Sequence, residues 1–384
     1  MRNAATLREK PAPTMRAFIS APPDAVLISA IAILVGIGLV MIFSASSATA
    51  FAVHHDATYY LKRQAIWLAV ALAAAYAAYR VDYTKLKAIS PLLFILSVIS
   101  LIAVLIPHVG IVVNTSRRWL GIGALSIQPS EFAKLALVLF LAAKLSSRGD
   151  RITSLVRGLF PLCIAMAVVV MLVLKEPDMG TASLLAFVAF TMLFAAGARV
   201  EHLGLIFVAT VPLVALALLA DPYKRARALA FLNPWKDPLN TGFHIVQSLL
   251  ALGSGGLFGV GLGASRAKFF YLPEQYTDFI FAVLGEELGL IGAVGVILLF
   301  IVFAHRAIRI ALRAPDRFGF FLTIGCTALI VIQALINIGV VTSSWPVTGV
   351  PLPFISFGGS SLVVCLVAVA LILNVGRARR VTAR

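Results

Sequence analysis

Apolar runs long enough to cross a lipid bilayer recur along most of this chain. About ten of them approach the roughly 18 to 25 residues that a membrane-spanning helix needs. They lie at 25–47, 64–79, 88–107, 129–146, 157–174, 181–198, 202–220, 277–304, 318–342 and 355–376. Because 61% of the residues are hydrophobic and 12% are charged, lipid rather than water is the solvent that this chain meets. The sequence predicts an all-α polytopic membrane protein with about ten transmembrane helices.

Basic residues between these runs predict the orientation of the chain in the membrane. If the N-terminus is cytoplasmic, the inner loops and tails hold twenty Lys and Arg residues, whereas the short outer loops hold five. Positive residues stay preferentially on the cytoplasmic side, so both termini are expected there. This topology and anionic lipid headgroups account for the net charge of +16, and a nucleic-acid partner is not expected.

The spacing of the runs predicts one membrane domain, residues 25–376, between a cytoplasmic tail at 1–24 and a basic cytoplasmic tail at 377–384. Within the domain, residues 221–276 form a large outer loop between the seventh and eighth helices, long enough to be functional. The loop includes the helix-compatible run HIVQSLLAL and then six glycines between Gly253 and Gly263. Such glycines suit either a close approach to a ligand or the tight packing of an interfacial loop.

Three carboxylates fall within ten positions at the start of the eighth predicted helix: Asp278, Glu286 and Glu287. An acid beside hydrocarbon costs about 3 kcal/mol unless a cavity or a partner receives it, so a functional site is the first interpretation. On a helix, Asp278 and Glu286 could border one cavity at different depths. A partly desolvated Asp278 near the outer surface could act as a general base toward a hydroxyl. The alternative is that Thr277 or Asp278 only caps the helix.

A second group of polar residues surrounds the start of the fourth predicted helix. Glu131 and Lys134 share one helix face, as a structural ion pair or as part of a polar cavity. Arg117 and Arg118 precede them and could bind a ligand phosphate or ordinary lipid headgroups. Trp119 is typical of an aromatic anchor at the membrane interface.

Two further segments combine polar residues with helix breakers. In KEPDMGTA a turn is sufficient to explain the Pro and Gly, but Glu176 and Asp178 together with Asp278 could also hold Mg²⁺ or Mn²⁺. Three prolines forbid a regular helix between 343 and 358, where the sequence reaches Gly-Gly-Ser-Ser with Ser360. Broken backbone at membrane depth must be buried or line a cavity. Gln333 and Asn337, one helical turn apart, add polar groups on one face of the ninth helix.

Several long motifs in this order resemble the SEDS family (shape, elongation, division and sporulation), which is typified by RodA and FtsW. The resemblance is carried by RRWLGIGALSIQPSEFAKLALVLFLA, KEPDMGTA, FHIVQSLLALGSGGLFGVGLG, YLPEQYTDFIFAVLGEELGLIGA and PVTGVPLPFISFGGSSL. It extends over nearly the whole chain after the N-terminal tail. The segments MIFSASS, YYLKRQ and NTSRRW are more similar to the FtsW branch than to the RodA branch.

The resemblance implies a peptidoglycan glycosyltransferase that polymerises lipid II at the outer face of the bacterial cytoplasmic membrane. Asp278 corresponds to the family's essential aspartate, Glu131 and Lys134 to polar residues of its central cavity, and Trp119 to a tryptophan at the cavity's mouth. The candidate substrate-binding set is completed by Arg117, Arg118, Asp178, Glu286 and Ser360. The implied partners are lipid II, a class B penicillin-binding protein and other membrane proteins of the division or elongation machinery.

Two other functional classes use the same residues. A flippase for an undecaprenyl-linked lipid would need polar groups through the full depth of the membrane, whereas a glycosyltransferase needs its base at one face. The predicted position of Asp278 at the boundary favours the enzyme. A scaffold that only recruits a penicillin-binding protein would retain its function in an Asp278→Asn variant.

Overall fold

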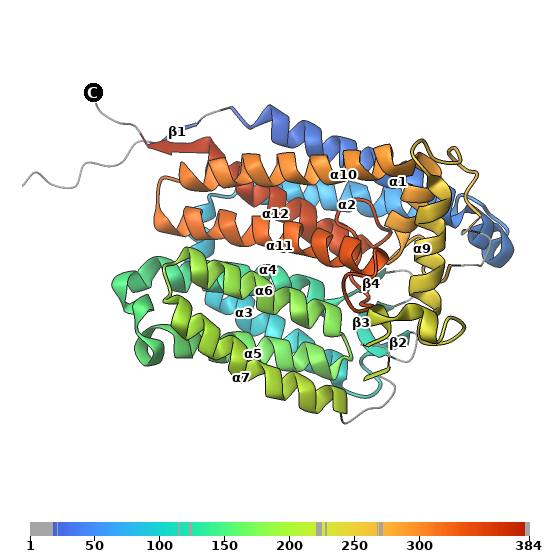
Figure 1. Cartoon of the computed structure of the whole chain (residues 1–384). Helices are drawn as coiled ribbons and strands as arrows, with labels where there is room; N and C mark the ends of the chain where they lie inside the picture. The colour runs from blue at the N-terminus through green and yellow to red at the C-terminus, as the bar shows by residue number, and fades with distance from the viewer. Residues whose placement is uncertain are drawn as a thin grey trace, which may run out of the picture.

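The computed structural model describes residues 18–20, 22–113, 116–122, 125–219, 225–226, 229–266, 268 and 272–380. In this part of the chain, ten helices of 16 to 33 residues run along one common direction and form a bundle (Figure 1). They are α1 (Ala25–His54), α2 (Tyr59–Arg80), α3 (Tyr83–Leu105), α4 (Pro129–Arg148), α5 (Phe160–Lys175), α6 (Met179–Ala195), α7 (Val200–Leu219), α10 (Ile280–Leu312), α11 (Arg317–Val341) and α12 (Gly359–Arg377). The short turns η1 (Gly149–Thr153) and η2 (Leu155–Leu159) lead from α4 into α5.

The helices have the length and the surface of membrane spans. Six helical segments of the described chain are long and apolar enough to cross a bilayer: α1, α3, Leu155–Lys175, α10, α11 and α12. Large apolar side chains such as Leu92, Ile95 and Ile99 of α3 are more than half exposed, which a lipid surround explains. The expectation of an all-α polytopic membrane protein is confirmed.

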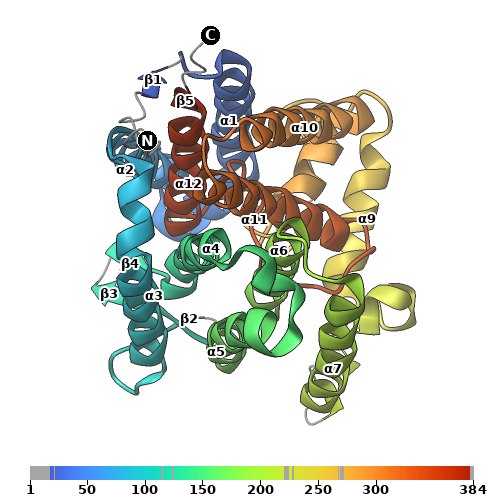
Figure 2. The ribbon, with the colours of Figure 1, turned by 90° about the vertical axis from the view of Figure 1, so that its left-hand side faces the viewer.

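Helix α11 lies at the centre of the bundle and packs against α4, α6, α10 and α12 (Figure 2). Most of its side chains are buried, in contrast to those of α3 or α5. Polar side chains on α11 therefore face other helices rather than lipid. From this position Gln333 and Asn337 of α11 form hydrogen bonds with several neighbouring segments.

Both ends of the described chain lie at the same end of the bundle. Strand β1 (Phe18–Ser20) pairs antiparallel with β5 (Ala378–Arg380) near the start of α1 and the end of α12 (Figure 1). Nearby, Arg306 of α10 donates from Nε and Nη2 to the carboxylate of Asp24 at 3.0 and 2.6 Å. The pairing agrees with an even number of spans. Residues 1–17 and 381–384 of the predicted tails lie outside the described residues.

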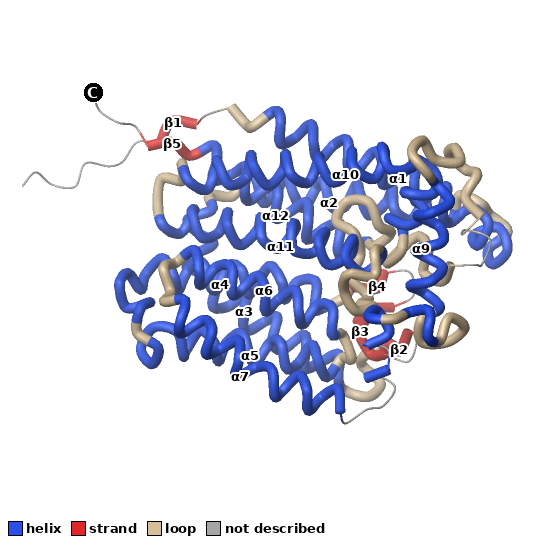
Figure 3. Tube along the Cα trace, viewed as in Figure 1, coloured by secondary structure: helices blue, strands red, loops and turns tan. Residues whose placement is uncertain are grey.

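The opposite end of the bundle carries a small sheet that the sequence analysis did not predict. Strands β2 (Ile111–Val113), β3 (Ser116–Ile122) and β4 (Leu125–Ile127) form an antiparallel sheet in that order, between α3 and α4 (Figure 3). The three strands are three to seven residues long, which is too short to give a clear alternation of apolar and polar residues. The sheet places Arg117, Arg118 and Trp119 on β3.

The large loop between α7 and α10 contains its own helix. After the turns η3 (Ala230–Leu232) and η4 (Pro234–Lys236), helix α9 (Phe243–Gly255) crosses the end of the bundle beside the small sheet (Figure 1). The helix predicted from HIVQSLLAL is thus confirmed. Residues 220–224, 227–228, 267 and 269–271 of this region lie outside the described residues.

The glycine-rich run after α9 packs into a break in α10. Gly289 has the non-helical angles φ 67° and ψ −170°, which interrupt the helical hydrogen bonds around it. The backbone N–H groups of Val260 and Gly261 donate instead to the carbonyls of Glu286 and Glu287 at 2.9 and 3.1 Å. Polar backbone groups freed by the break are therefore satisfied inside the protein, as membrane depth requires.

This packing explains why particular positions of the run are glycine. A Cβ atom at Gly259 would lie 2.1 Å from the carbonyl oxygen of Glu287, and Gly259 itself has φ +81°. The glycine is required both by its left-handed backbone and by the close approach of α10. Gly255 and Gly259 thus serve packing against α10, whereas a Cβ atom at Gly253, Gly256 or Gly261 would meet nothing within 4 Å.

We predict that Gly259→Ala lowers the free energy of unfolding by about 2 kcal/mol or more, because the added methyl group has no room and the backbone is strained. Gly253→Ala is the matched control, since a Cβ there meets nothing within 4 Å. Thermal unfolding in detergent would measure both variants. Equal melting temperatures for the two would contradict the packing described here.

Candidate active site

Asp278 lies on a short segment that precedes α10 rather than in the helix itself. We call residues 272–279 the strap. The N-cap position of α10 is Phe279, and the hydroxyl of Thr277 donates to the carbonyl and the carboxylate of Glu274. The expected helix start at 277 is thus two to three residues too early, and the helical offset between Asp278 and Glu286 does not apply. The side chain of Asp278 is half-buried and lies near Arg118 of β3, at the end of the bundle that carries the small sheet.

Asn337 of α11 fixes the backbone of the strap. Its Nδ2 group donates to the carbonyl of Asp278 at 2.7 Å and to the carbonyl of Val350 at 2.8 Å. Val350 belongs to residues 342–358, which connect α11 to α12 without regular structure and which we call the proline segment. One buried amide therefore holds two non-helical segments together.

Further hydrogen bonds join the strap to the proline segment directly. The hydroxyl of Ser356 donates to the carbonyl of Thr277 at 2.6 Å and accepts from the backbone N–H of Leu352 at 2.8 Å. The backbone N–H of Phe357 donates to the carbonyl of Tyr276 at 2.9 Å. These contacts position Asp278 through its main chain.

Arg118 of β3 brings a positive charge to the same place. Its Nε and Nη2 groups donate to the carbonyls of Glu176 and Pro177 at 2.9 and 2.5 Å. Its third nitrogen, Nη1, lies 3.8 Å from Oδ2 of Asp178. The guanidinium is thus oriented by the turn between α5 and α6.

Gly349 of the proline segment marks the space that Arg118 and Asp278 share. A Cβ atom built there would lie 3.5 Å from Oδ2 of Asp278 and 3.7 Å from Nη1 of Arg118. The carboxylate of Asp278 and the guanidinium of Arg118 therefore both lie within 4 Å of one point beside Gly349. A carboxylate can accept a proton there, and a guanidinium can bind an anion such as a phosphate.

The two acids of the turn between α5 and α6 have different surroundings. Asp178 caps α6, since its Oδ1 accepts from the N–H of Thr181 at 2.9 Å. Glu176 is fully buried, and among the described residues neither of its carboxylate oxygens has a hydrogen-bond partner. Burial raises the pKa of Glu176 to about 8, the nearby Asp178 carboxylate adds to the rise, and Arg118 opposes it.

The structure does not assemble the predicted divalent cation site. Within the described part of the chain, no three His, Cys, Asp or Glu side chains lie close enough together to hold a metal ion. The oxygens of Asp178 accept from Thr181 instead. The Mg²⁺ or Mn²⁺ ion stays a prediction from the sequence.

The predicted pair on α4 is present and lies deeper in the bundle. Nζ of Lys134 is 2.7 Å from Oε2 of Glu131, and both side chains are almost fully buried. Lys134 also donates to Oε1 of Gln333 at 3.0 Å, and Gln333 donates to the carbonyl of Pro351 at 2.9 Å. The pair is therefore connected to the proline segment through α11.

The other predicted residues, Ser360, Trp119 and Arg117, differ in their contacts and in their burial. The hydroxyl of Ser360, at the start of α12, accepts from the backbone N–H of Gln128 at 3.2 Å, which ties α12 to the start of α4. Trp119 is half-buried on β3, and Arg117 is exposed.

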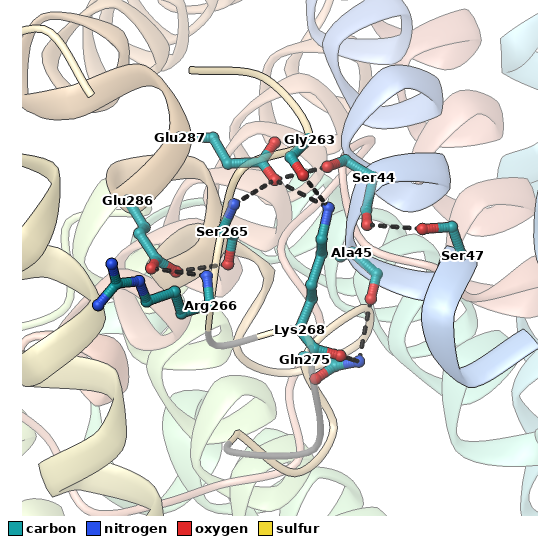
Figure 4. A network of polar contacts seen from close by, with 10 residues as sticks. All are labelled: Ser44, Ala45, Ser47, Gly263, Ser265, Arg266, Lys268, Gln275, Glu286 and Glu287. Atoms are coloured by element: carbon teal, nitrogen blue, oxygen red, sulfur yellow. Dashed lines mark hydrogen bonds and ion pairs between the residues drawn. The ribbon is translucent and has the colours of Figure 1, made fainter. Parts of the chain in front are cut away.

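Glu286 and Glu287 lie in a second network, shown in Figure 4. Glu286 accepts from the hydroxyl of Ser265 and from the backbone N–H of Arg266, the latter at 2.9 Å. Glu287 accepts from the hydroxyl of Ser44 at 2.6 Å and lies 4.0 Å from Nζ of Lys268. Both acids thus anchor residues 265–266 and 268 to α10 and α1, which differs from the expectation that Glu286 borders a cavity with Asp278.

The same network reaches the strap. Nε2 of Gln275 donates to the carbonyl of Ala45 and to the carbonyl of Lys268, both at 3.0 Å (Figure 4). The strap is therefore held by α1 at Gln275 and by α11 at Asp278.

Sequence reasoning missed Gln64, Ser356 and Gly349. Gln64 of α2 is buried, and its Oε1 accepts from the backbone N–H of Gly358 at 3.3 Å. A glutamine at the edge of the apolar run of α2 was an available signal. No comparable signal marks Ser356 and Gly349, because their roles depend on the path of the proline segment.

A cavity of about 320 Å³ lies at the other end of α11, near Asp316 and Arg317. Its lining is mostly alanine and phenylalanine. It contains none of the candidate site residues, and we assign it no role.

Comparisons with known proteins now place the chain in a family. The model of the FtsW, RodA and SpoVE family, described as "Cell cycle protein", matches residues 25–381. The chain belongs to this family. Stage V sporulation protein E of Bacillus subtilis is 48% identical over 93% of this chain and 98% of its own length. The probable peptidoglycan glycosyltransferase FtsW of Geobacter metallireducens is 43% identical over 88% of this chain and 90% of its own length.

Solved structures of the FtsW, RodA and SpoVE family share the fold. A chain from a study titled "Structural coordination of polymerization and crosslinking by a peptidoglycan synthase complex" matches with a TM-score of 0.76 and 30% identity, over 92% of this chain and 98% of that one. The rod shape determining protein RodA of Thermus thermophilus matches with a TM-score of 0.69 and 30% identity, over 92% and 97%. The resemblance to the SEDS family is confirmed.

The buried ion pair gives a test of the site's packing. We predict that Lys134→Met lowers the free energy of unfolding by about 3 to 5 kcal/mol, because Glu131 is left buried and without its charge partner. The double variant with Glu131→Gln and Lys134→Met removes both charges and should recover part of that loss. Melting temperatures of the purified proteins would measure it. A double variant less stable than Lys134→Met would contradict this account.

Proposed function

We propose that this member of the FtsW, RodA and SpoVE family is a peptidoglycan glycosyltransferase that polymerises lipid II, with Asp278 as its general base. One observation carries the proposal. The carboxylate of Asp278 is half-buried at one end of the bundle, is positioned through its main chain, and shares the space at Gly349 with the guanidinium of Arg118. Relatives named probable peptidoglycan glycosyltransferase FtsW support the choice of reaction.

The reaction follows from these two groups. The carboxylate of Asp278 takes the proton of the acceptor's sugar 4-hydroxyl, and the oxygen attacks the anomeric carbon of the donor. A new carbon–oxygen bond forms while the bond from the anomeric carbon to the diphosphate breaks, and undecaprenyl diphosphate leaves with the electron pair. Arg118 lies where its charge can stabilise that anion, since guanidinium groups bind phosphates by paired hydrogen bonds.

The packing of α4 favours this reaction over a flippase. Glu131 and Lys134 pair with one another near one end of the helix. Further along the same helix, the buried positions Leu137, Leu141 and Leu145 are apolar. A flippase needs polar groups through the full depth of the membrane, whereas the buried polar side chains of α4 lie near one end of the helix.

The branch, the location and the partners complete the proposal. Relatives named FtsW and SpoVE at 39 to 48% identity favour that side of the family over RodA, whose solved structure is 30% identical. We place the chain in the bacterial cytoplasmic membrane, with both termini cytoplasmic and lipid II bound at the outer face. A class B penicillin-binding protein is the proposed partner, in line with the matched peptidoglycan synthase complex.

We predict that Asp278→Asn lowers glycan polymerisation on the order of 10² to 10⁴-fold, because an amide cannot accept the hydroxyl proton. The measurement is polymer formed from lipid II by the purified chain with its cognate penicillin-binding protein, resolved on a gel. Asp82→Asn is the matched control. Asp82 is exposed and accepts from the N–H of Thr84 at the start of α3, and asparagine caps a helix equally well.

The outcomes separate the three classes of function. Loss of polymer in Asp278→Asn, with the complex intact and the control active, supports the enzyme. Equal polymer from the native chain and Asp278→Asn would remove Asp278 as the base. No polymer from the native chain, but transfer of labelled lipid II across proteoliposomes, would favour the flippase.

A further inference from the structure

The buried carboxyl group of Glu176 lies near the guanidinium of Arg118. Glu176 follows the last residue of α5, is 0% exposed, and has no hydrogen-bond partner for either carboxylate oxygen among the described residues. A buried carboxylate in that state would be costly unless it bound a proton. Glu176 therefore differs from the other acids near the site, each of which accepts hydrogen bonds or faces a cation.

The donors of Arg118 are directed at backbone rather than at the Glu176 carboxyl. Two of its nitrogens donate to the carbonyls of Glu176 and Pro177, and the third lies toward Asp178. A guanidinium beside an ionised glutamate usually forms a paired, two-point contact with the carboxylate. Its absence here is the geometry expected for a neutral Glu176 side chain.

The charged groups around Glu176 come from each element at this end. They are Arg118 on β3 and Asp178 at the start of α6, and Asp278 of the strap lies beyond Arg118, on the other side of Gly349. Together they hold one positive and two negative charges. Burial raises the pKa of Glu176 to about 8, and Asp178 adds to this rise, so the group is largely protonated at pH 7 and ionises as the pH passes 8.

We propose that Glu176 is a positioning residue whose neutral carboxyl leaves the guanidinium of Arg118 available to the diphosphate of the lipid-linked substrate. The inference rests on the proposed glycosyltransferase function and names a determinant of substrate binding within it. If Glu176 ionised, a third negative charge would compete for Arg118 and repel the diphosphate. Binding would then weaken without a change in the base, Asp278.

The test is the pH dependence of KM for lipid II, measured with the full chain and its penicillin-binding protein. For the native protein, KM should rise on the order of tenfold between pH 7 and pH 9, relative to Glu176→Gln, whose side chain stays neutral. The turnover number should depend on pH in the same way in both. Glu201→Gln, an exposed glutamate at the start of α7, is the matched control and should follow the native profile.

Two results would overturn the proposal. One is a Glu176→Gln profile of KM that parallels the native one. The other is a several-fold higher KM for Glu176→Gln at pH 7, which would mean that the ionised carboxylate contributes to binding. A purely structural role of Glu176 would lower the turnover number and the melting temperature but would not change the slope of KM with pH.

A binding measurement separates this inference from the proposed reaction. Undecaprenyl diphosphate is titrated into nanodiscs that contain the native chain, Glu176→Gln or Arg118→Ala, at pH 7 and pH 9. The proposal requires that affinity falls with pH only in the native chain, and that Arg118→Ala binds weakly at both pH values. If this pattern holds while no polymer forms, the reaction is wrong but the role of Glu176 stands. If polymer forms while affinity is the same in all three, the role of Glu176 is wrong.

A stability measurement checks that Glu176→Gln folds. An acid whose pKa is raised on folding binds its proton more tightly in the folded state, so native stability falls as the pH rises from about 4.5 to about 8. Glutamine lacks this loss. The melting temperature of Glu176→Gln should equal the native value near pH 4 and exceed it at pH 8. A lower value at pH 8 would contradict the neutral, unpartnered state.

Discussion

Non-helical backbone inside a membrane protein must find its hydrogen bonds within the protein, and this requirement shapes the site. The strap and the proline segment are both irregular and lie against the central helix α11. Asn337 supplies donors to one carbonyl of each, and Gln333 supplies a further donor to the proline segment. Without these two amides, several buried carbonyls would lose their partners at a cost of about 1 to 3 kcal/mol each. The same hydrogen bonds fix the backbone position of Asp278.

The same requirement explains the two other irregular features. The break in α10 at Gly289 is closed by backbone donors from the glycine-rich run, and the carboxylates of Glu286 and Glu287 hold the loop that follows. Acids that looked like part of a catalytic cavity are therefore anchors of the outer loop. A buried carboxylate in a membrane protein can take part in catalysis or can anchor a loop, and its position in the sequence does not distinguish these two roles.

Most of the helices could be predicted from the sequence, because the apolar runs are long and are separated by charged turns. The i, i+3 spacing of Glu131 and Lys134, and the i, i+4 spacing of Gln333 and Asn337, also predicted shared faces correctly. The β2–β4 sheet was not predicted, since its short strands leave little periodic signal. The surroundings of Glu176 and Gly349 could not be predicted either. They arise where the turn after α5, strand β3 and the proline segment come into contact. No local sequence pattern shows that these three segments lie together in the fold.

The strap is attached to α1 through Gln275 and to α11 through Asp278, three residues further on, and the carbonyls of Tyr276 and Thr277 between them accept from the proline segment. A segment this short cannot stretch, so a change in the separation of α1 and α11 must appear as a rotation of the peptide groups between them. The direction of the Asp278 carboxylate would turn with it. A protein or lipid that wedges against the outer face of α1 could thus alter the reacting geometry without entering the site.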